Sequence, residues 1–126
     1  MSDAADTGLL LVAHGSRRDA SNEEIRSLTR ALAQQSAGRY GAVECAFLEL
    51  ADPSIPDGLC ALIERGIRRI ILVPYFLSAG RHVAQDIPAE VARVLERYPQ
   101  AEIRIAPYVG LAAGIPGLIL RQAAEG

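Results

Sequence analysis

The fold class of this protein follows from one short stretch, GLLLVA at positions 8–13, which carries no polar side chain. A strand buried on both faces of a sheet has this pattern, whereas a strand with one face in water alternates apolar and polar residues. Strands buried on both faces belong to parallel sheets, in which helices cover both sides. The stretch therefore predicts a parallel strand near the start of the chain.

Three more strand-like stretches follow, at 42–48, 68–77 and 101–107. The second of these contains the apolar run IILV at 70–73, which is the strongest strand signal in the chain. Such a run, with no polar residue to face water, predicts a strand in the middle of the sheet.

A helical pattern follows each strand. The first helix is expected to begin with a capping box, in which Ser21 and Glu24 satisfy free backbone amides, and to end at Gly38. Later helices are expected at 54–66, 88–99 and 115–124, each with a proline near its first turn.

Strict alternation of strand and helix predicts an α/β fold of flavodoxin-like type. We expect an open, parallel, four-stranded sheet with right-handed connections and helices on both faces. With 126 residues the chain has enough surface to bury for one core, so a single domain is expected over 8–126, after a disordered tail at 1–7. Ligands of such sheets bind outside the carboxyl ends of the strands. So small a sheet leaves surface exposed, which favours a dimer.

The charged residues exclude several functions. All 13 basic residues are arginine, and the lack of lysine excludes Schiff-base catalysis and the P-loop, which both need a lysine amine. The net charge of −2 predicts no general affinity for nucleic acid or acidic membranes.

Cysteine use and hydropathy favour a cytoplasmic protein. Cys45 and Cys60 lack the spacing of a zinc finger or a disulfide scaffold, so we expect both to pack in the core as small residues. No signal peptide is visible in the first residues, and the longest apolar runs fall far below the ~20 residues that a membrane span requires.

The chain contains two histidines, His14 and His82, and each follows a predicted strand. Glu49 follows another. In a sheet with the strand order 2-1-3, all three would lie at one carboxyl edge and the two imidazoles would face one cleft. Two imidazoles and a carboxylate suit divalent Fe, Co, Ni or Zn. The alternative is that each histidine is a turn residue bonded to the backbone.

Several other polar residues lie in the same predicted loops. Ser16, Arg17 and Arg18 precede a helix N-terminus, where free amides favour anions, and Arg81 adjoins His82. These arginines could hold carboxylates, or could be solvated surface charges. Asp86 is expected to be an N-cap.

Four segments together carry a family resemblance. They are VAHGSR at 12–17, Glu49 with ADPSI at 51–55, VPYFLSAGRH at 73–82, and DIP at 86–88. The set resembles the short, CbiX type of sirohydrochlorin chelatase and covers nearly the whole chain.

The resemblance implies a chelatase fold and an enzyme that inserts a divalent metal into sirohydrochlorin. Co²⁺ is the first expectation, with Fe²⁺ or Ni²⁺ as alternatives, on the way to cobalamin, sirohaem or a nickel tetrapyrrole. The metal is then a substrate, and no organic cofactor is expected. Longer members of the family look like two fused copies of such a unit, so this chain is expected to act as a homodimer.

The resemblance also implies roles for individual residues. The family's two metal-site histidines match His14 and His82, which would bind the metal and take up protons. The acidic partner is expected at Glu49, with Glu44 and Asp52 as close alternatives. The carboxylates of sirohydrochlorin would be held by nearby polar side chains, namely Ser16, Arg17, Arg18, Ser78 and Arg81.

Two other kinds of function would use some of the same residues. Phosphohistidine enzymes carry an R-H-G motif, and Ala13 before His14 counts against them. A binding module without turnover stays open. It would carry a metal or a tetrapyrrole on the same histidines, or a flavin phosphate in the loop at 16–22, where hydroxyls are sparse.

Overall fold

The computed structural model describes residues 4–126 as a parallel α/β fold with one four-stranded sheet. The strand order is β2-β1-β3-β4, so the predicted fold class and the predicted order of the first three strands are confirmed. The strands and long helices are, in chain order, β1 (Thr7–Ala13), α1 (Asp19–Ser36), β2 (Ala42–Phe47), α2 (Ile55–Glu64), β3 (Arg69–Pro74), α3 (Ile87–Arg97), β4 (Glu102–Ile105) and α4 (Ile115–Glu125).

The two central strands, β1 and β3, carry the apolar runs that the sequence analysis singled out. Val12 of β1 lies opposite Ala46 of β2 on one side and Pro74 of β3 on the other. The carboxyl ends of β1, β2 and β3 therefore lie side by side. Leu10 and Leu72, one from each central strand, are fully buried, as expected for strands covered on both faces.

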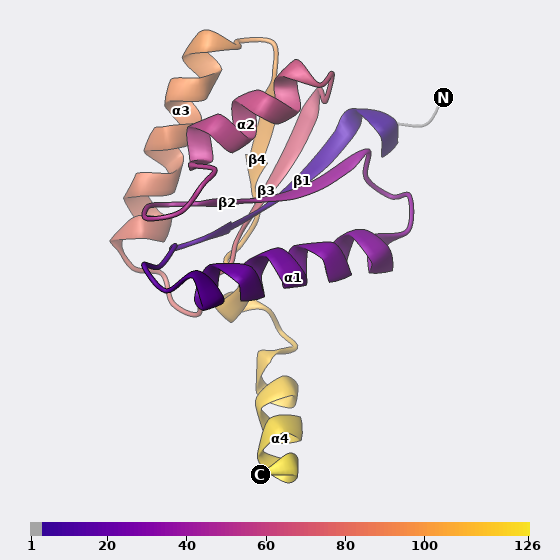
Figure 1. Ribbon diagram of the computed structural model, residues 1–126, viewed down its shortest axis with the longest axis vertical. Coiled ribbons are helices and arrows are strands. Elements are labelled where there is room, and N and C mark those ends of the chain that lie inside the picture. Colours follow the sequence, from indigo (N-terminus) through magenta and orange to yellow (C-terminus); the bar gives the residue numbers. More distant parts are fainter. Residues whose placement is uncertain (1–3) are drawn as a thin grey trace.

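Helices α2 and α3 cover one face of the sheet and α1 covers part of the other (Figure 1). The main core lies between the sheet and the α2–α3 pair, because alternate residues of β1 and β3 point to that side. α1 packs against β2 on the opposite side, where Arg26 lies over the ring of Phe47, 5.6 Å from its centroid. The core residues on the α2–α3 side include Leu10, Val12, Ile55, Leu59, Leu62, Ile70, Leu72, Ile87, Val91 and Val94.

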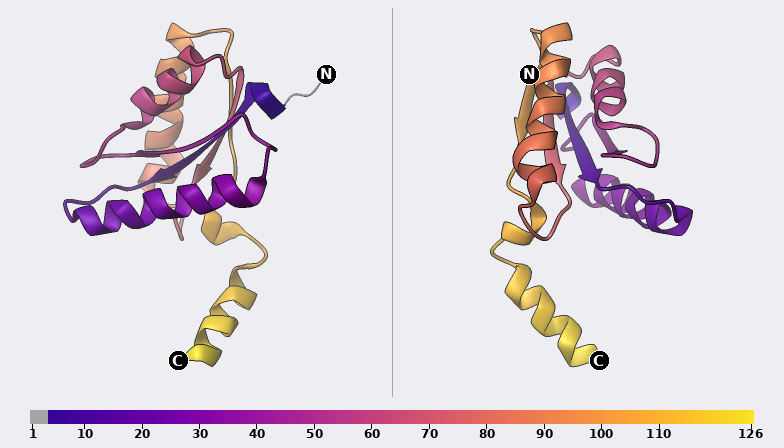
Figure 2. Two further views of the ribbon diagram at one scale, coloured as in Figure 1. Left: turned by 45° about the vertical axis from the view of Figure 1, so that its right-hand side comes forward. Right: turned by 90° about the vertical axis from the view of Figure 1, so that its left-hand side faces the viewer.

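The last helix, α4, covers neither face. It forms at the predicted place, but it points away from the body of the protein (Figures 1 and 2) and none of its residues is buried. The prediction of helices on both faces thus holds for α1, α2 and α3.

The start of the chain corrects one prediction. Ala4–Asp6 form a short 3-10 turn and Thr7 opens β1, so the prediction of a disordered tail over 1–7 is wrong from Ala4 onward. Two backbone bonds hold this segment, because the Arg68 amide donates to the Asp6 carbonyl and the Gly41 amide to that of Thr7. Residues 1–3 of the predicted tail lie outside the described residues.

The helix starts give one correction and one confirmation. α1 begins at Asp19, before the predicted capping box at Ser21, and its N-cap residue Arg18 has no side-chain cap. The capping-box prediction is wrong because the helix starts three residues earlier, with Arg18 and not Ser21 at the N-cap. α2 begins as predicted, with the Ser54 hydroxyl accepting a bond from the Asp57 amide at 3.2 Å.

Cys45 and Cys60 are free thiols and each is half-buried. Cys60 packs against the core, and burial raises the pKa of its thiol, which lowers its reactivity. Among the described residues, no helix is long and apolar enough to cross a membrane. The cytoplasmic location stays a prediction.

Candidate metal centre

The fold brings His14, Glu49 and His82 together at the carboxyl edge of the sheet. His14 is the first residue after β1, Glu49 follows β2, and His82 opens a short π-helical turn, η2 (His82–Asp86), that leads into α3. The two imidazole rings have centroids 5.0 Å apart and an angle of 62° between their planes. Nε2 of His14 lies 3.3 Å from Oε2 of Glu49. The strand order therefore places the three predicted side chains in one cluster.

Gly15 permits the close approach of the loops that carry His14 and Glu49. Its φ is +91°, and a Cβ atom there would lie 1.8 Å from the carbonyl oxygen of Glu49. Only glycine fits, because any side chain would overlap this oxygen and would strain the backbone. The Glu49 amide donates to the His14 carbonyl at 3.1 Å, so the two loops are joined by a backbone bond next to the functional side chains.

The hydrogen bonds of His14 indicate which ring nitrogen is free. Nδ1 lies 3.0 Å from the carbonyl oxygen of Gly15, and a carbonyl oxygen can only accept, so Nδ1 carries the hydrogen in the neutral ring. Nε2 then presents its lone pair to the Glu49 carboxylate. Two acceptors 3.3 Å apart attract a proton or a cation between them. Two ligands of one tetrahedral metal at about 2.1 Å would be about 3.4 Å apart, so this pair has the spacing of metal ligands.

His82 is oriented by a carboxylate that the sequence analysis interpreted differently. Its Nδ1 lies 2.7 Å from Oδ2 of Asp86, four residues later. Asp86 occupies the N-cap position of α3 but forms no cap bond, so the N-cap role predicted for its side chain is wrong. The π-helical turn places residues 82 and 86 on one side, and the carboxylate binds the imidazole instead. This leaves Nε2 of His82 free, as in the carboxylate–histidine–metal arrangement.

The cluster is an open site. Within residues 4–126, no three His, Cys, Asp or Glu side chains converge on a single point, so His14 and Glu49 form a pair with His82 beside it. Closed sets of four ligands hold structural metals, whereas sites that exchange or process a ligand keep positions open. The arrangement therefore suits a metal that enters and leaves.

The structure distinguishes Glu49 from its neighbours in sequence. Glu44 points to the edge of β2 and pairs with Arg65 at 3.0 Å, and both Glu44 and Asp52 line a hollow between α1 and α2. Of the three carboxylates that the sequence left as alternatives, Glu49 is the one beside His14.

Asn22 is a residue of this region that the sequence analysis did not single out. It is almost fully buried, accepts a bond from the Ser16 amide at 2.9 Å and donates to the Ser16 carbonyl at 2.8 Å. The Ser16 hydroxyl accepts from the Arg18 amide at 3.0 Å. The polar groups of Ser16 thus stabilise the loop after His14. Asn22 could have been found from the sequence, because it is a polar residue at an inward-facing position of the first helix.

The arginines predicted to bind carboxylates lie exposed around the site. Arg17, Arg18 and Arg81 form no ion pair within the described part of the chain, and Ser78 is exposed in the loop before Arg81. Unpaired guanidinium groups are available for bidentate bonds to carboxylates. Their role in binding stays a prediction.

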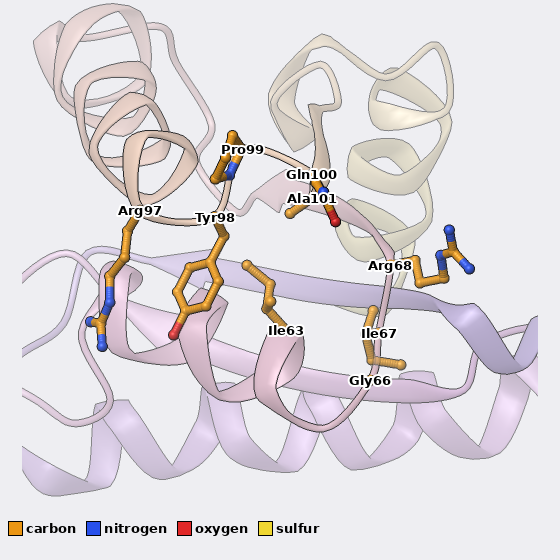
Figure 3. A pocket seen from close by; sticks show the side chains of 9 residues that line it. All are labelled: Ile63, Gly66, Ile67, Arg68, Arg97, Tyr98, Pro99, Gln100 and Ala101. Atoms are coloured by element: carbon orange, nitrogen blue, oxygen red, sulfur yellow. The ribbon is translucent and has the colours of Figure 1, made fainter.

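The hollow next to the cluster is small. It has a volume of about 280 Å³ and is lined by residues that include Glu49, His82 and Asp86. A larger hollow of about 620 Å³ lies at the opposite edge of the sheet, where Tyr98, Arg97 and Arg68 line it (Figure 3). It is lined by no histidine, cysteine or carboxylate, so this hollow lacks the side chains that usually bind divalent metals. The Tyr98 hydroxyl donates to Glu64, and this bond raises the pKa of Tyr98.

A parallel α/β unit with two imidazoles and a carboxylate at its carboxyl edge belongs to the class of open-sheet proteins whose sites lie at that edge. Residues 8–126 match the CbiX family model. This chain belongs to the CbiX family, and the resemblance seen in the sequence is confirmed.

Similar proteins of known name support this assignment. The sirohydrochlorin cobaltochelatase of Sulfolobus acidocaldarius is 34% identical over 118 residues, which are 94% of this chain and 89% of that protein. The sirohydrochlorin ferrochelatase of Priestia megaterium is 34% identical over 118 residues, which are 93% of this chain and 43% of that protein. This chain thus spans less than half the length of that relative.

Two solved structures have the same fold. A CbiX protein from Marinobacter aquaeolei VT8 superposes with a TM-score of 0.78 at 28% identity, over 94% of each chain. The chelatase SirB from Bacillus subtilis subspecies spizizenii, in complex with cobalt, superposes with a TM-score of 0.84 at 27% identity, over 95% of this chain and 50% of that one.

Proposed function

We propose that this protein inserts a divalent metal into sirohydrochlorin, with Co²⁺ as the first candidate and Fe²⁺ or Ni²⁺ as alternatives. The single observation that carries the proposal is the cluster of His14, Glu49 and His82, in which a His14–Glu49 pair lies beside the ring of His82 at one edge of a CbiX-family fold. The names of the relatives include both a cobaltochelatase and a ferrochelatase, and an imidazole–carboxylate site binds either metal. The product would serve cobalamin or sirohaem-type synthesis, and no organic cofactor is required.

The chemistry of insertion assigns a task to each side chain. The metal must lose water, and the macrocycle must lose two pyrrole protons as the M²⁺ ion replaces them. His14 and Glu49 would hold the metal on one side of the ring, and His82 would complete its ligands. As the metal passes to the pyrrole nitrogens, the freed imidazoles and carboxylate can each take up a proton, so the charge balances.

We propose further that the exposed arginines at this edge hold the carboxylates of the substrate. Replacing Arg81 with glutamine is expected to raise KM for sirohydrochlorin several-fold and to leave kcat within about twofold, because the bond forms equally in the ground and transition states. Steady-state kinetics measures both constants. Arg39→Gln is the matched control, since Arg39 is also exposed and lies in the turn before β2, at the opposite edge of the sheet. Equal KM values for Arg81→Gln and wild type would contradict the role.

A second expectation concerns the orientation of His82. Replacing Asp86 with alanine is expected to weaken Co²⁺ binding about 10- to 100-fold, as loss of such an outer carboxylate does at other metal sites, because the imidazole then turns freely. Asp86→Asn keeps an acceptor and should recover part of the affinity. The measurement is calorimetric titration of the protein with Co²⁺ alone. Glu90→Ala is the control, because Glu90 lines the same hollow but pairs with Arg93. A loss that is equal for Asp86→Ala and Glu90→Ala would refute the specific role.

We also propose that the working unit is a homodimer. The hollow beside one cluster, about 280 Å³, is below the usual range of pockets that enclose a ligand, and a tetrapyrrole is a large ligand. This chain matches half of the SirB chain. In the proposed dimer, a second copy would take the place of the other half and would form the second wall of the substrate cleft.

The test of the proposed function is anaerobic insertion of Co²⁺, Fe²⁺ and Ni²⁺ into sirohydrochlorin, followed by absorbance. Acceleration above the uncatalysed rate is expected and would rank the metals. If metal or sirohydrochlorin binds without any acceleration, the protein is a carrier and the enzymatic proposal fails. If neither binds, the family's activity is absent from this chain.

A further inference from the structure

The loop between β1 and α1 is held by a hydrogen bond at each of the three peptide units that follow His14. In the first unit, the His14 carbonyl accepts from the Glu49 amide at 3.1 Å. In the second, the Ser16 amide donates to Oδ1 of Asn22 at 2.9 Å. In the third, the Ser16 carbonyl accepts from Nδ2 of Asn22 at 2.8 Å. One side chain, that of Asn22, thus holds two consecutive peptide units.

Asn22 suits this task because its side-chain amide has the same donor and acceptor as a peptide group. A backbone amide can only donate and a carbonyl can only accept, so the two partners on Ser16 fix which end of the side chain carries the oxygen. Asn22 belongs to α1 and is 4% exposed, and close packing restricts a side chain so deeply buried. The body of the helix therefore sets the position of the loop.

The second of these peptide units also contacts the imidazole of His14. The Gly15 carbonyl and the Ser16 amide belong to this one unit, which is planar and rigid. The carbonyl oxygen lies 3.0 Å from Nδ1 of His14, and the amide binds Asn22. Glycine is the residue whose backbone turns most freely, so the unit after Gly15 needs a partner to fix it. The bond from Asn22 to the amide fixes the direction of the carbonyl.

A competing position for the hydrogen of His14 gives this bond its importance. The Gly15 carbonyl favours the hydrogen on Nδ1, whereas the Glu49 carboxylate, 3.3 Å from Nε2, would accept a hydrogen from Nε2. A metal binds only a bare ring nitrogen. If the Gly15 carbonyl turned away, Glu49 would draw the hydrogen to Nε2 and the nitrogen that faces the metal position would be blocked.

We infer that Asn22 is a positioning residue for the proposed reaction. Through the Gly15–Ser16 peptide unit it keeps the hydrogen of His14 on Nδ1 and leaves Nε2 open to the metal. Both polar atoms of Asn22 are bonded to the backbone of Ser16, so it acts through the loop and not as a metal ligand. The inference rests on the proposed function, but the tautomer it concerns is a property of the protein without metal or substrate.

Heteronuclear NMR of the metal-free protein tests the inference, because bare and hydrogen-bearing ring nitrogens differ in chemical shift. The chain has two histidines, and comparison with His82→Ala assigns their signals. At about pH 8.5, where neutral imidazole is observed, wild-type His14 is expected to carry its hydrogen on Nδ1. Asn22→Leu keeps the shape of the side chain and removes both bonds. It should lower the ratio of the Nδ1–H to the Nε2–H form about tenfold, as the loss of one hydrogen bond does.

Two results of this measurement would overturn the inference. One is a wild-type His14 with its hydrogen on Nε2, which needs no variant to be seen. The other is a wild-type ratio in Asn22→Leu. Asn22→Ala removes the same two bonds without adding an apolar group, so it should give the same change and serves if the leucine variant does not fold.

Thr29→Val is the matched control. Thr29 is also buried on α1, and its hydroxyl donates to the Ile25 carbonyl at 2.8 Å. The variant keeps the shape of the side chain and removes a buried bond of the same helix without touching the loop, so the His14 tautomer should stay that of the wild type. An equal change in Thr29→Val and Asn22→Leu would mean that any weakening of α1 has this effect, and the specific role of Asn22 would fail.

Calorimetric titration with Co²⁺ alone measures the consequence for the metal. Asn22→Leu is expected to weaken Co²⁺ binding about tenfold, as loss of a group that orients a metal ligand does, and Thr29→Val should stay within about twofold of wild type. Unchanged affinity in Asn22→Leu would overturn the inference.

Insertion assays separate the inference from the proposed function. A tautomer and a Co²⁺ affinity that depend on Asn22, in a protein that does not accelerate insertion, would end the proposed function alone. Insertion by a protein whose Asn22→Leu variant keeps the wild-type tautomer would end the role of Asn22 alone.

Discussion

The His82→Ala variant is expected to insert Co²⁺ into sirohydrochlorin roughly 10²- to 10⁴-fold more slowly than the wild-type chain, which is the usual contribution of a general acid–base residue. The effect is large because the imidazole has two tasks in the proposed reaction: it holds the metal, and it accepts a proton as the metal leaves. His14→Ala should lose a similar amount, since the ring lies 3.3 Å from Glu49.

Controls separate this effect from loss of the fold. His82 is 42% exposed, so its truncation should leave the thermal unfolding transition nearly unchanged. Glu49→Gln compared with Glu44→Gln gives a matched pair, because both carboxylates follow or belong to β2 and only Glu49 is beside His14. Insertion rates of His82→Ala and Glu49→Gln that are both close to wild type would reject the assigned cluster.

The second large effect is expected at Gly15. Gly15→Ala should destabilise the protein by about 1–3 kcal/mol, the usual cost of a strained residue, and should also abolish insertion, because the new Cβ would lie 1.8 Å from the Glu49 carbonyl oxygen. To relieve this overlap the two loops must separate, which moves His14 away from Glu49. Urea unfolding measures the stability, and calorimetric titration with Co²⁺ measures the loss of the site.

The matched control for Gly15→Ala is Gly66→Ala. Gly66 has a similar φ of +96°, but nothing lies within 4 Å of the position of its Cβ. The Gly66→Ala variant should lose only the free energy of unfolding that an alanine at positive φ costs, about 1–2 kcal/mol. Its affinity for Co²⁺ should stay that of the wild type. If both variants bind Co²⁺ as tightly as wild type, the close approach at Gly15 does not build the site.

Much of the fold was predictable because it depends on burial patterns that are local in sequence. The strand stretches lack polar residues, and their alternation with helices leaves few topologies once right-handed connections are required. The order β2-β1-β3-β4 then follows from the doubly wound arrangement, and with it the meeting of His14, Glu49 and His82 at one edge. The composition alone excluded Schiff-base catalysis and a P-loop, because the chain contains no lysine.

Errors arose where a polar side chain had a choice of partners. The Asp86 carboxylate could cap α3 or bind His82. The start of α1 could be capped by Ser21, or the loop before it could be held by Asn22, which bonds to the backbone of Ser16. Sequence spacing permits both outcomes, because N-cap and i, i+4 partners lie within a few residues of each other. The choice depends on how the loops approach, which is set by contacts between segments distant in the chain.

The sequence by itself determined the sheet, the placement of its strands and the residue types at its carboxyl edge, because periodicity and burial act over short segments. Only the tertiary structure decided that Glu49 and not Glu44 faces His14, that Asp86 orients His82, and that α4 packs on neither face of the sheet. Each of these depends on a distance between segments that no local pattern encodes, and at Gly15 that distance is short enough to exclude a single methyl group.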